Sequence, residues 1–148
     1  GPQQGALYSP MIIMTQVGSA AQFRPNEWPM LIWRAGQKVP ATGFDEDSSH
    51  INGILLATGQ RLIFIEEKGL IGKNYRARES IDYRAISGWQ VQPFMGMKSL
   101  QIDLIDGWNR RRTFHNLIEV DPMTLKPLTP QPAERVKAQL EQLTRGGQ

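Results

Sequence analysis

Short runs in which apolar and polar residues alternate dominate the middle of the chain. The clearest pair of runs is Ile51–Ala57 and Arg61–Glu67, which are rich in Ile, Leu and Phe and flank Thr58-Gly59-Gln60. Two such runs joined by a short glycine-containing turn predict a β-hairpin. Apolar residues occur at both odd and even positions of the second run, so we expect both faces of this hairpin to be partly covered.

Weaker runs extend the strand pattern on both sides of the hairpin. These runs are Met30–Arg34, Tyr75–Arg78, Ser80–Tyr83, Ile86–Gln92 and Leu100–Leu104. Asp106-Gly107 is typical of a tight hairpin turn, and Trp108–His115 is expected to return as the partner strand. About seven strands at such short spacing predict a mainly β fold, a small antiparallel barrel or sandwich.

The C-terminal segment has a helical period instead. In Ala133–Arg145, Val136, Leu140 and Leu143 recur at intervals of four and three residues. Pro132 precedes this segment and Gly146-Gly147 follows it, as is common at the two ends of a helix. The pattern predicts one amphipathic helix that covers an open end of the barrel.

The first residues carry no such pattern. We expect residues 1–25 to form a flexible extension, with Gly1-Pro2 resembling a remnant of protease cleavage, and residues 26–148 to form the domain. Met11–Met14 could add a short strand. The acidic run Asp45–Asp47 lacks the ligand spacing of a calcium loop and is interpreted as a solvated loop.

Composition narrows the chemistry. The 148 residues include 17 Lys and Arg against 14 Asp and Glu, two His and no Cys. Disulfides, thiol nucleophiles and thiolate metal sites are therefore excluded, and no paired acid–base or nucleophile pattern stands out. We expect a non-enzymatic protein without metal or cofactor. No apolar run approaches the roughly 20 residues of a membrane helix, and no secretory signal is visible, which favours the cytoplasm.

The positive charge is concentrated in residues 68–115, which hold nine Lys and Arg against four Asp and Glu, or +5. Guanidinium and ammonium groups on neighbouring strands suit phosphate oxygens. The predicted anionic-lipid site consists of Lys73, Arg76, Arg78, Lys98, Arg110 and Arg112. On a strand, Arg110 and Arg112 would share one face. The alternative is a solvated strand face paired with carboxylates.

Large apolar residues also occur in a predicted turn. Phe94, Met95 and Met97 surround Gly96 between two expected strands. As an exposed hairpin tip they would contact a protein partner or a membrane; alternatively, Phe94 and Met97 fold back over the barrel. The four tryptophans are scattered along the chain, and we expect them to pack in the core and its rim.

One stretch resembles a known family. Gly53–Phe64, with Gly53, Leu55, Thr58, Arg61-Leu62 and Phe64 in register, resembles the hairpin of pleckstrin-homology-like (PH-like) domains of the GRAM and bacterial types. It is most similar to that of GLUE domains in the ESCRT-II endosomal sorting complex. Asn26-Glu27 and Phe94–Ile102 resemble flanking parts of the same family. The resemblance covers about residues 26–145 and implies seven strands followed by one helix.

In that family the fold is non-catalytic and binds phosphoinositide headgroups, ubiquitin or peptides. The resemblance therefore implies an adaptor for ubiquitin, an anionic membrane surface, or both, located in the cytoplasm and at membranes. Two alternatives stay open: a bacterial-type PH-like domain acting through protein or homo-oligomeric contacts, and a nucleic-acid or transcription-associated module. A net charge of +3 without basic–aromatic interleaving disfavours nucleic acid. The oligomeric state stays open.

Overall fold

The computed structural model describes residues 15–39, 49–69 and 71–146. Its strands are β1 (Leu31–Val39), β2 (Ser49–Ala57), β3 (Arg61–Lys68), β4 (Asn74–Asp82), β5 (Ile86–Phe94), β6 (Met97–Leu104), β7 (Arg111–Val120) and β8 (Pro127–Pro130). A 3-10 turn, η1 (Tyr83–Ala85), links β4 to β5, and helix α2 (Ala133–Gly146) follows β8. The predicted mainly β fold with one C-terminal helix is confirmed.

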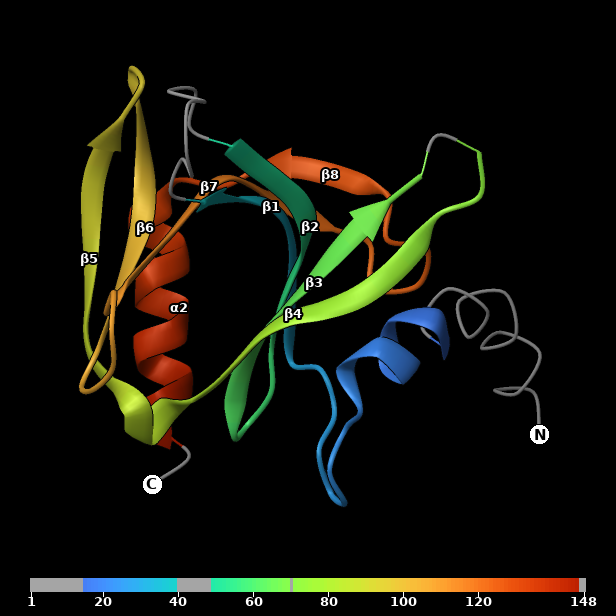
Figure 1. Cartoon of the computed structure of the whole chain (residues 1–148), viewed down its shortest axis with the longest axis horizontal. Helices are drawn as coiled ribbons and strands as arrows, with labels where there is room; N and C mark the ends of the chain where they lie inside the picture. Colours follow the sequence, from blue (N-terminus) through green and yellow to red (C-terminus); the bar gives the residue numbers. More distant parts are fainter. Residues whose placement is uncertain (1–14, 40–48, 70, 147–148) are drawn as a thin grey trace.

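All strands belong to one antiparallel sheet in the order β4-β3-β2-β1-β7-β6-β5, with β8 pairing with β7 beside it. The sheet curves strongly but does not close into a barrel, because β4 and β5 at its two ends do not pair with each other. Figure 1 shows β5 and β6 beside α2, while β3 and β4 cross the other half of the molecule. The arrangement is that of a sandwich with open ends.

The β2–β3 hairpin forms as predicted and is apolar on both faces. Leu55 pairs with Phe64 on one face, and Ile54 pairs with Ile65 on the other. All four side chains are fully buried. Side chains of directly paired residues share a face, so the two pairs belong to two separate hydrophobic clusters.

The first cluster fills the concave side of the sheet. It joins Trp33, Phe64 and Phe114 to residues of α2. Val136 and Leu140 of this helix are fully buried, and Leu143 is partly buried against the same cluster. The apolar stripe predicted for the helix therefore faces the sheet, and α2 covers β5, β6 and β7.

The second cluster lies on the opposite face and involves the N-terminal segment. Residues 15–21 form a short helix whose Val17 and Ala21 are buried against Ile54 and Ile63. The prediction of a flexible extension over residues 1–25 is therefore wrong for residues 15–25, because the outer apolar face of β2 and β3 needs a cover. Residues 1–14, including Met11–Met14, and the acidic run Asp45–Asp47 lie outside the described residues.

A buried ion pair fixes this N-terminal segment to the hairpin. Nε and Nη2 of Arg61 each donate to the carboxylate of Glu27 at 2.9 Å, and the Thr58 hydroxyl donates to it at 2.8 Å. Nη2 of Arg61 also donates to the carbonyls of Ala21 and Gln22. We call Glu27, Thr58 and Arg61 the clasp. Burial raises the pKa of Glu27, but the hydrogen bonds from Arg61, the Arg24 backbone and Thr58 outweigh burial and lower it to about 2.

Two details of the strand prediction are wrong. The Asp106-Gly107 turn is part of a longer loop, and β7 begins at Arg111, so Arg110 does not share a strand face with Arg112. The proline-rich segment before α2 contributes strand β8. Of the tryptophans, Trp33 is 2% exposed as predicted, whereas Trp28 and Trp108 are 61% and 97% exposed.

Candidate functional site: a basic pocket at the edge of the sheet

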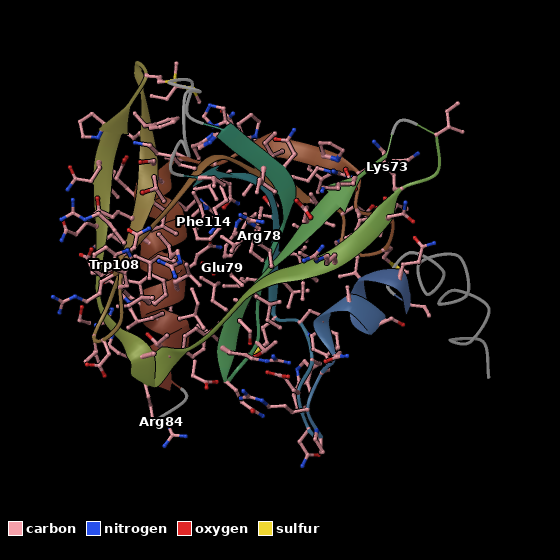
Figure 2. The ribbon with its side chains drawn as sticks, viewed as in Figure 1. Lys73, Arg78, Glu79, Arg84, Trp108 and Phe114 are labelled. Carbon is pink, nitrogen blue, oxygen red and sulfur yellow. The ribbon has the colours of Figure 1, made fainter. Side chains whose placement is uncertain are left out.

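A cavity of about 560 Å³ lies where the end of β1, the middle of β4 and the start of β7 approach each other. We call it the basic pocket. Its lining residues are Gln37, Lys38, Val39, Arg78, Glu79, Asn109, Arg111, Arg112 and Thr113. Figure 2 shows Arg78 and Glu79 near the centre of the molecule, whereas Lys73 and Arg84 lie at its periphery.

Strand pairing brings the polar centre of this pocket together. Glu79 pairs with Phe64, and Gln37 pairs with Phe114. Arg112 pairs with Ile102. Each partner belongs to the first hydrophobic cluster, so the three polar side chains lie on the concave side and form its rim. Nε of Arg112 donates to the Glu79 carboxylate, and Nε2 of Gln37 donates to the same oxygen at 3.2 Å.

Arg78 reaches the pocket because β4 is irregular. The pairing of β4 with β3 shifts between Ala77 and Glu79, and Arg78 has no partner in the register. An extra residue of this kind redirects side chains relative to simple alternation. Nε of Arg78 donates to Oε1 of Gln37 at 3.2 Å, so Arg78 and Glu79 both contact Gln37 although they are adjacent in sequence.

The pocket has an excess of positive charge. Four cations, Lys38, Arg78, Arg111 and Arg112, line it with one carboxylate, Glu79, which gives a formal +3. Glu79 is already bound by Arg112. The Arg111 side chain remains 69% exposed and only approaches Asp103 at 3.6 Å. A planar guanidinium group can donate two parallel hydrogen bonds to a phosphate, so the charge and the donors of this pocket suit a multiply charged anion.

The structure brings together two of the six residues predicted for anion binding, Arg78 and Arg112. The other four lie outside the pocket lining. Lys73 is in the β3–β4 loop, where its Nζ donates to the Gly69 carbonyl. Arg76, on β4, is exposed and pairs with Glu66 of β3. Arg110 donates to the Ile105 carbonyl, and Lys98 lies 3.6 Å from Glu134.

Sequence reasoning missed Lys38 and Arg111. Lys38 is the second residue from the end of β1, next to a loop without a motif, so only the folded sheet places it beside β7. Simple alternation along a strand places Arg111 on the face opposite Arg112, but as the first residue of β7 it lines the pocket beside Arg112. The signal that could have identified it is the unbroken Arg110-Arg111-Arg112 run itself.

A larger cavity, of about 880 Å³, lies near the start of α2 but has a different character. Its four charged side chains form two ion pairs, Arg34 with Glu67 and Lys98 with Glu134. It therefore presents no net charge to a ligand. Within the described residues, no three His, Asp or Glu side chains are grouped to hold a metal ion, and no helix is long and apolar enough to cross a membrane.

The predicted apolar contact site forms the tip of the β5–β6 hairpin. Met95 is 78% and Met97 51% exposed. Phe94 instead folds back: its ring stacks on His115 with centroids 4.7 Å apart, and Nζ of Lys38 lies 5.6 Å above it. Nε2 of His115, a buried residue, lies 2.9 Å from Nδ1 of His50. Of the three residues predicted for this contact site, Met95 and Met97 are therefore exposed, whereas Phe94 packs against His115.

No protein-family model and no curated protein matches the sequence. Among solved structures, the chain is similar to the crystal structure of the C-terminal domain of an unknown protein from Leishmania infantum. The two share a TM-score of 0.56 at 13% identity, with 88% of this chain and 97% of that domain covered. This likeness concerns the fold alone.

Proposed function

We propose that the protein is a non-catalytic binding module that holds a phosphate-bearing anion in the basic pocket. The observation that carries the proposal is the cluster of four cations around a single carboxylate that is already paired. Lys38, Arg78 and Arg111 are exposed and take no part in the Arg112–Glu79 ion pair, so they present positive charge to a ligand. Phosphate oxygens would neutralise this charge and accept hydrogen bonds from the guanidinium groups of Arg78 and Arg111.

A phosphorylated lipid headgroup is the ligand class that we favour, and a PH-like domain of the GLUE type is the family that we propose. Two observations support this. Within the single sheet, β1–β4 and β5–β7 each form a run of sequentially adjacent antiparallel strands, and one helix follows them. This is the order of elements in PH-like domains. The residues that carry the resemblance, Thr58 and Arg61, together bind Glu27 from the flanking segment. The proposed setting is a cytoplasmic membrane surface.

The test is binding of inositol hexakisphosphate, a soluble polyphosphate, measured by titration calorimetry. We expect Arg78→Gln with Arg111→Gln to weaken binding at least about tenfold, because two charge-assisted contacts are lost. The matched control is Lys73→Gln with Arg76→Gln, which removes the same charge outside the pocket. Equal losses of affinity in the two double variants would show that only the net charge matters. Unchanged affinity in Arg78→Gln with Arg111→Gln would refute the proposal that the basic pocket binds the anion.

A second function is supported by the exposed Met95 and Met97 at the β5–β6 tip. We propose this tip as a contact for a protein partner, with ubiquitin as the first candidate. Flexible, apolar methionines suit weak protein contacts. NMR titration with labelled ubiquitin tests the proposal: Met95→Ser with Met97→Ser is expected to abolish shift changes, while Met123→Ser, at another exposed methionine, leaves them intact. Identical titrations for the wild type and the tip variant would contradict it.

A further inference from the structure

The loop between β6 and β7 carries the most exposed tryptophan among the described residues. Trp108 is 97% exposed, and Ile105 on the same loop is 47% exposed. Exposing a complete indole to water forgoes one of the largest apolar burials available to a side chain. Packing within the fold does not explain why a tryptophan stands at this position, because Trp108 belongs to neither hydrophobic cluster.

Trp108 is held out on a structured loop rather than on a loose end. The Leu104 N–H donates to the Arg110 carbonyl at 2.7 Å, and the Ile105 N–H donates to the Ala85 carbonyl at 2.8 Å. Nη1 of Arg112 donates to the Asn109 carbonyl. These contacts fix both ends of the loop and tie its exit to a residue of the basic pocket.

The loop places Trp108 directly beside the basic pocket. Asn109, the next residue, lines the pocket, and consecutive Cα atoms are about 3.8 Å apart. Arg110 and Arg111 follow directly in the chain; both are exposed, and Arg111 also lines the pocket. The segment Trp108–Arg111 therefore combines an exposed indole with two exposed arginines, and its Asn109 and Arg111 line the basic pocket. Figure 2 shows Trp108 in the half of the molecule that contains β5 and β6.

We propose that this loop docks on a lipid bilayer, with the Trp108 indole in the interfacial layer and the basic pocket on an anionic headgroup. The inference rests on the proposed function and adds a second contact, the insertion of Trp108 into the bilayer interface. Tryptophan prefers the boundary between headgroups and acyl chains, where its ring is apolar and its N–H stays hydrated. The flanking arginines match the negative surface of such a membrane.

A bilayer suits the surface better than a protein partner. A stable protein interface needs a patch of apolar residues with a polar rim, whereas this loop exposes only two large apolar side chains, Trp108 and Ile105. The exposed charged residues beside them are Asp106, Arg110 and Arg111. Membrane association commonly combines two individually weak signals, an apolar insertion and an electrostatic attraction. Trp108 supplies the first signal and the pocket with Arg111 supplies the second.

The first experiment compares two ligands for three proteins: wild type, Trp108→Ala and Trp28→Ala. Trp28 is the matched control, because it is 61% exposed but outside the pocket lining. Binding to phosphatidylcholine vesicles containing phosphatidylinositol bisphosphate is measured by sedimentation, and binding to inositol hexakisphosphate by calorimetry. We expect Trp108→Ala to lose about tenfold in vesicle affinity and to keep its affinity for the soluble ligand, while Trp28→Ala keeps both.

The outcomes separate the two proposals. If the wild type binds the soluble ligand but no vesicles, or if Trp108→Ala binds vesicles as well as wild type, membrane docking is overturned and the pocket proposal stands. If the wild type binds neither ligand, the proposed function fails and docking fails with it. Equal losses for Trp108→Ala and Trp28→Ala would also overturn docking, because the effect would not be specific to this loop.

A second measurement needs no alanine variant at position 108. In a Trp28→Phe protein, Trp108 is the one largely exposed tryptophan among the described residues, since Trp33 is buried and Trp89 is partly buried. Adding vesicles should shift its fluorescence to shorter wavelength, and lipids brominated near the headgroup boundary should quench it. Emission that is unchanged under conditions where the protein sediments with vesicles would overturn the insertion.

Discussion

The clasp of Glu27, Thr58 and Arg61 should govern the stability of the fold, and Glu27→Gln is the change that tests it. The Glu27 side chain is fully buried and Arg61 is 8% exposed, so water does not screen the pair. Glutamine keeps the shape of the side chain but removes its charge. The Arg61 guanidinium would then be buried without a counterion, and such an orphaned charge is strongly destabilising.

The magnitude follows from the pKa of Glu27, which the clasp lowers from 4.5 to about 2 against the opposing effect of burial. At about 1.4 kcal/mol for each tenfold change, this corresponds to about 3 kcal/mol of preference for the charged carboxylate in the folded state. Because the folded pKa is lowered, this stability is fully present above pH 4.5 and is lost as the pH falls toward about 2.

Urea unfolding followed by tryptophan fluorescence measures both consequences. At pH 7, Glu27→Gln should lower the free energy of unfolding by about 3 kcal/mol, and its stability should depend less on pH between 4.5 and 2 than that of the wild type. The control is Glu141→Gln, which breaks the partly exposed i, i+4 ion pair with Lys137 and should cost less than about 0.5 kcal/mol. A loss below about 1 kcal/mol for Glu27→Gln would refute the reasoning.

Three further changes probe the packing. Leu140→Ala in α2 empties a fully buried position and should cost about 2–5 kcal/mol in urea unfolding; a loss under about 1 kcal/mol would mean that the helix does not complete the core. Gly36→Ala would place a Cβ 2.6 Å from Cε1 of His115 and should lower the melting temperature, whereas the open position Gly96 should tolerate Asn. Burial, with help from His50, lowers the pKa of His115 from 6.5, so stability should decrease as the pH falls below 6.5, and His115→Gln should flatten that slope.

The parts of the fold that were predictable from the sequence are those in which local pattern and tertiary packing agree. The β2–β3 hairpin consists of two long apolar runs and buries both of its faces, whereas α2 has a helical period and buries the stripe that this period indicates. Residues 15–21 lack a comparable pattern, because a short helix with two buried side chains, Val17 and Ala21, gives too little periodicity to recognise. β8 was missed for a different reason: prolines lack the N–H of a strand ladder, yet Pro127 and Pro130 pair at the margin of β7.

The candidate site was harder to predict because it depends on irregular pairing. The concentration of positive charge in residues 68–115 is visible in the sequence, and two of the six residues predicted for anion binding, Arg78 and Arg112, line the same pocket. Simple alternation, however, places Arg78 and Glu79 on opposite faces, and only the shift in the β3–β4 register brings both to Gln37. Likewise, Arg110 was misplaced because six loop residues replace the two-residue turn expected at Asp106-Gly107.

The position of the basic pocket follows from where the core ends. On the concave side, the first cluster ends at Phe64, Phe114 and Ile102. The residues paired with these three on the neighbouring strands are polar, and they form the rim: Glu79, Gln37 and Arg112. Glu79 neutralises one arginine there, which lets Arg112 sit partly buried without an orphaned charge. The remaining cations are exposed and solvated, so their repulsion costs little in the free domain. In the proposed complex the anionic ligand would neutralise them, and the affinity of the domain for a soluble phosphate ligand should accordingly fall as ionic strength rises.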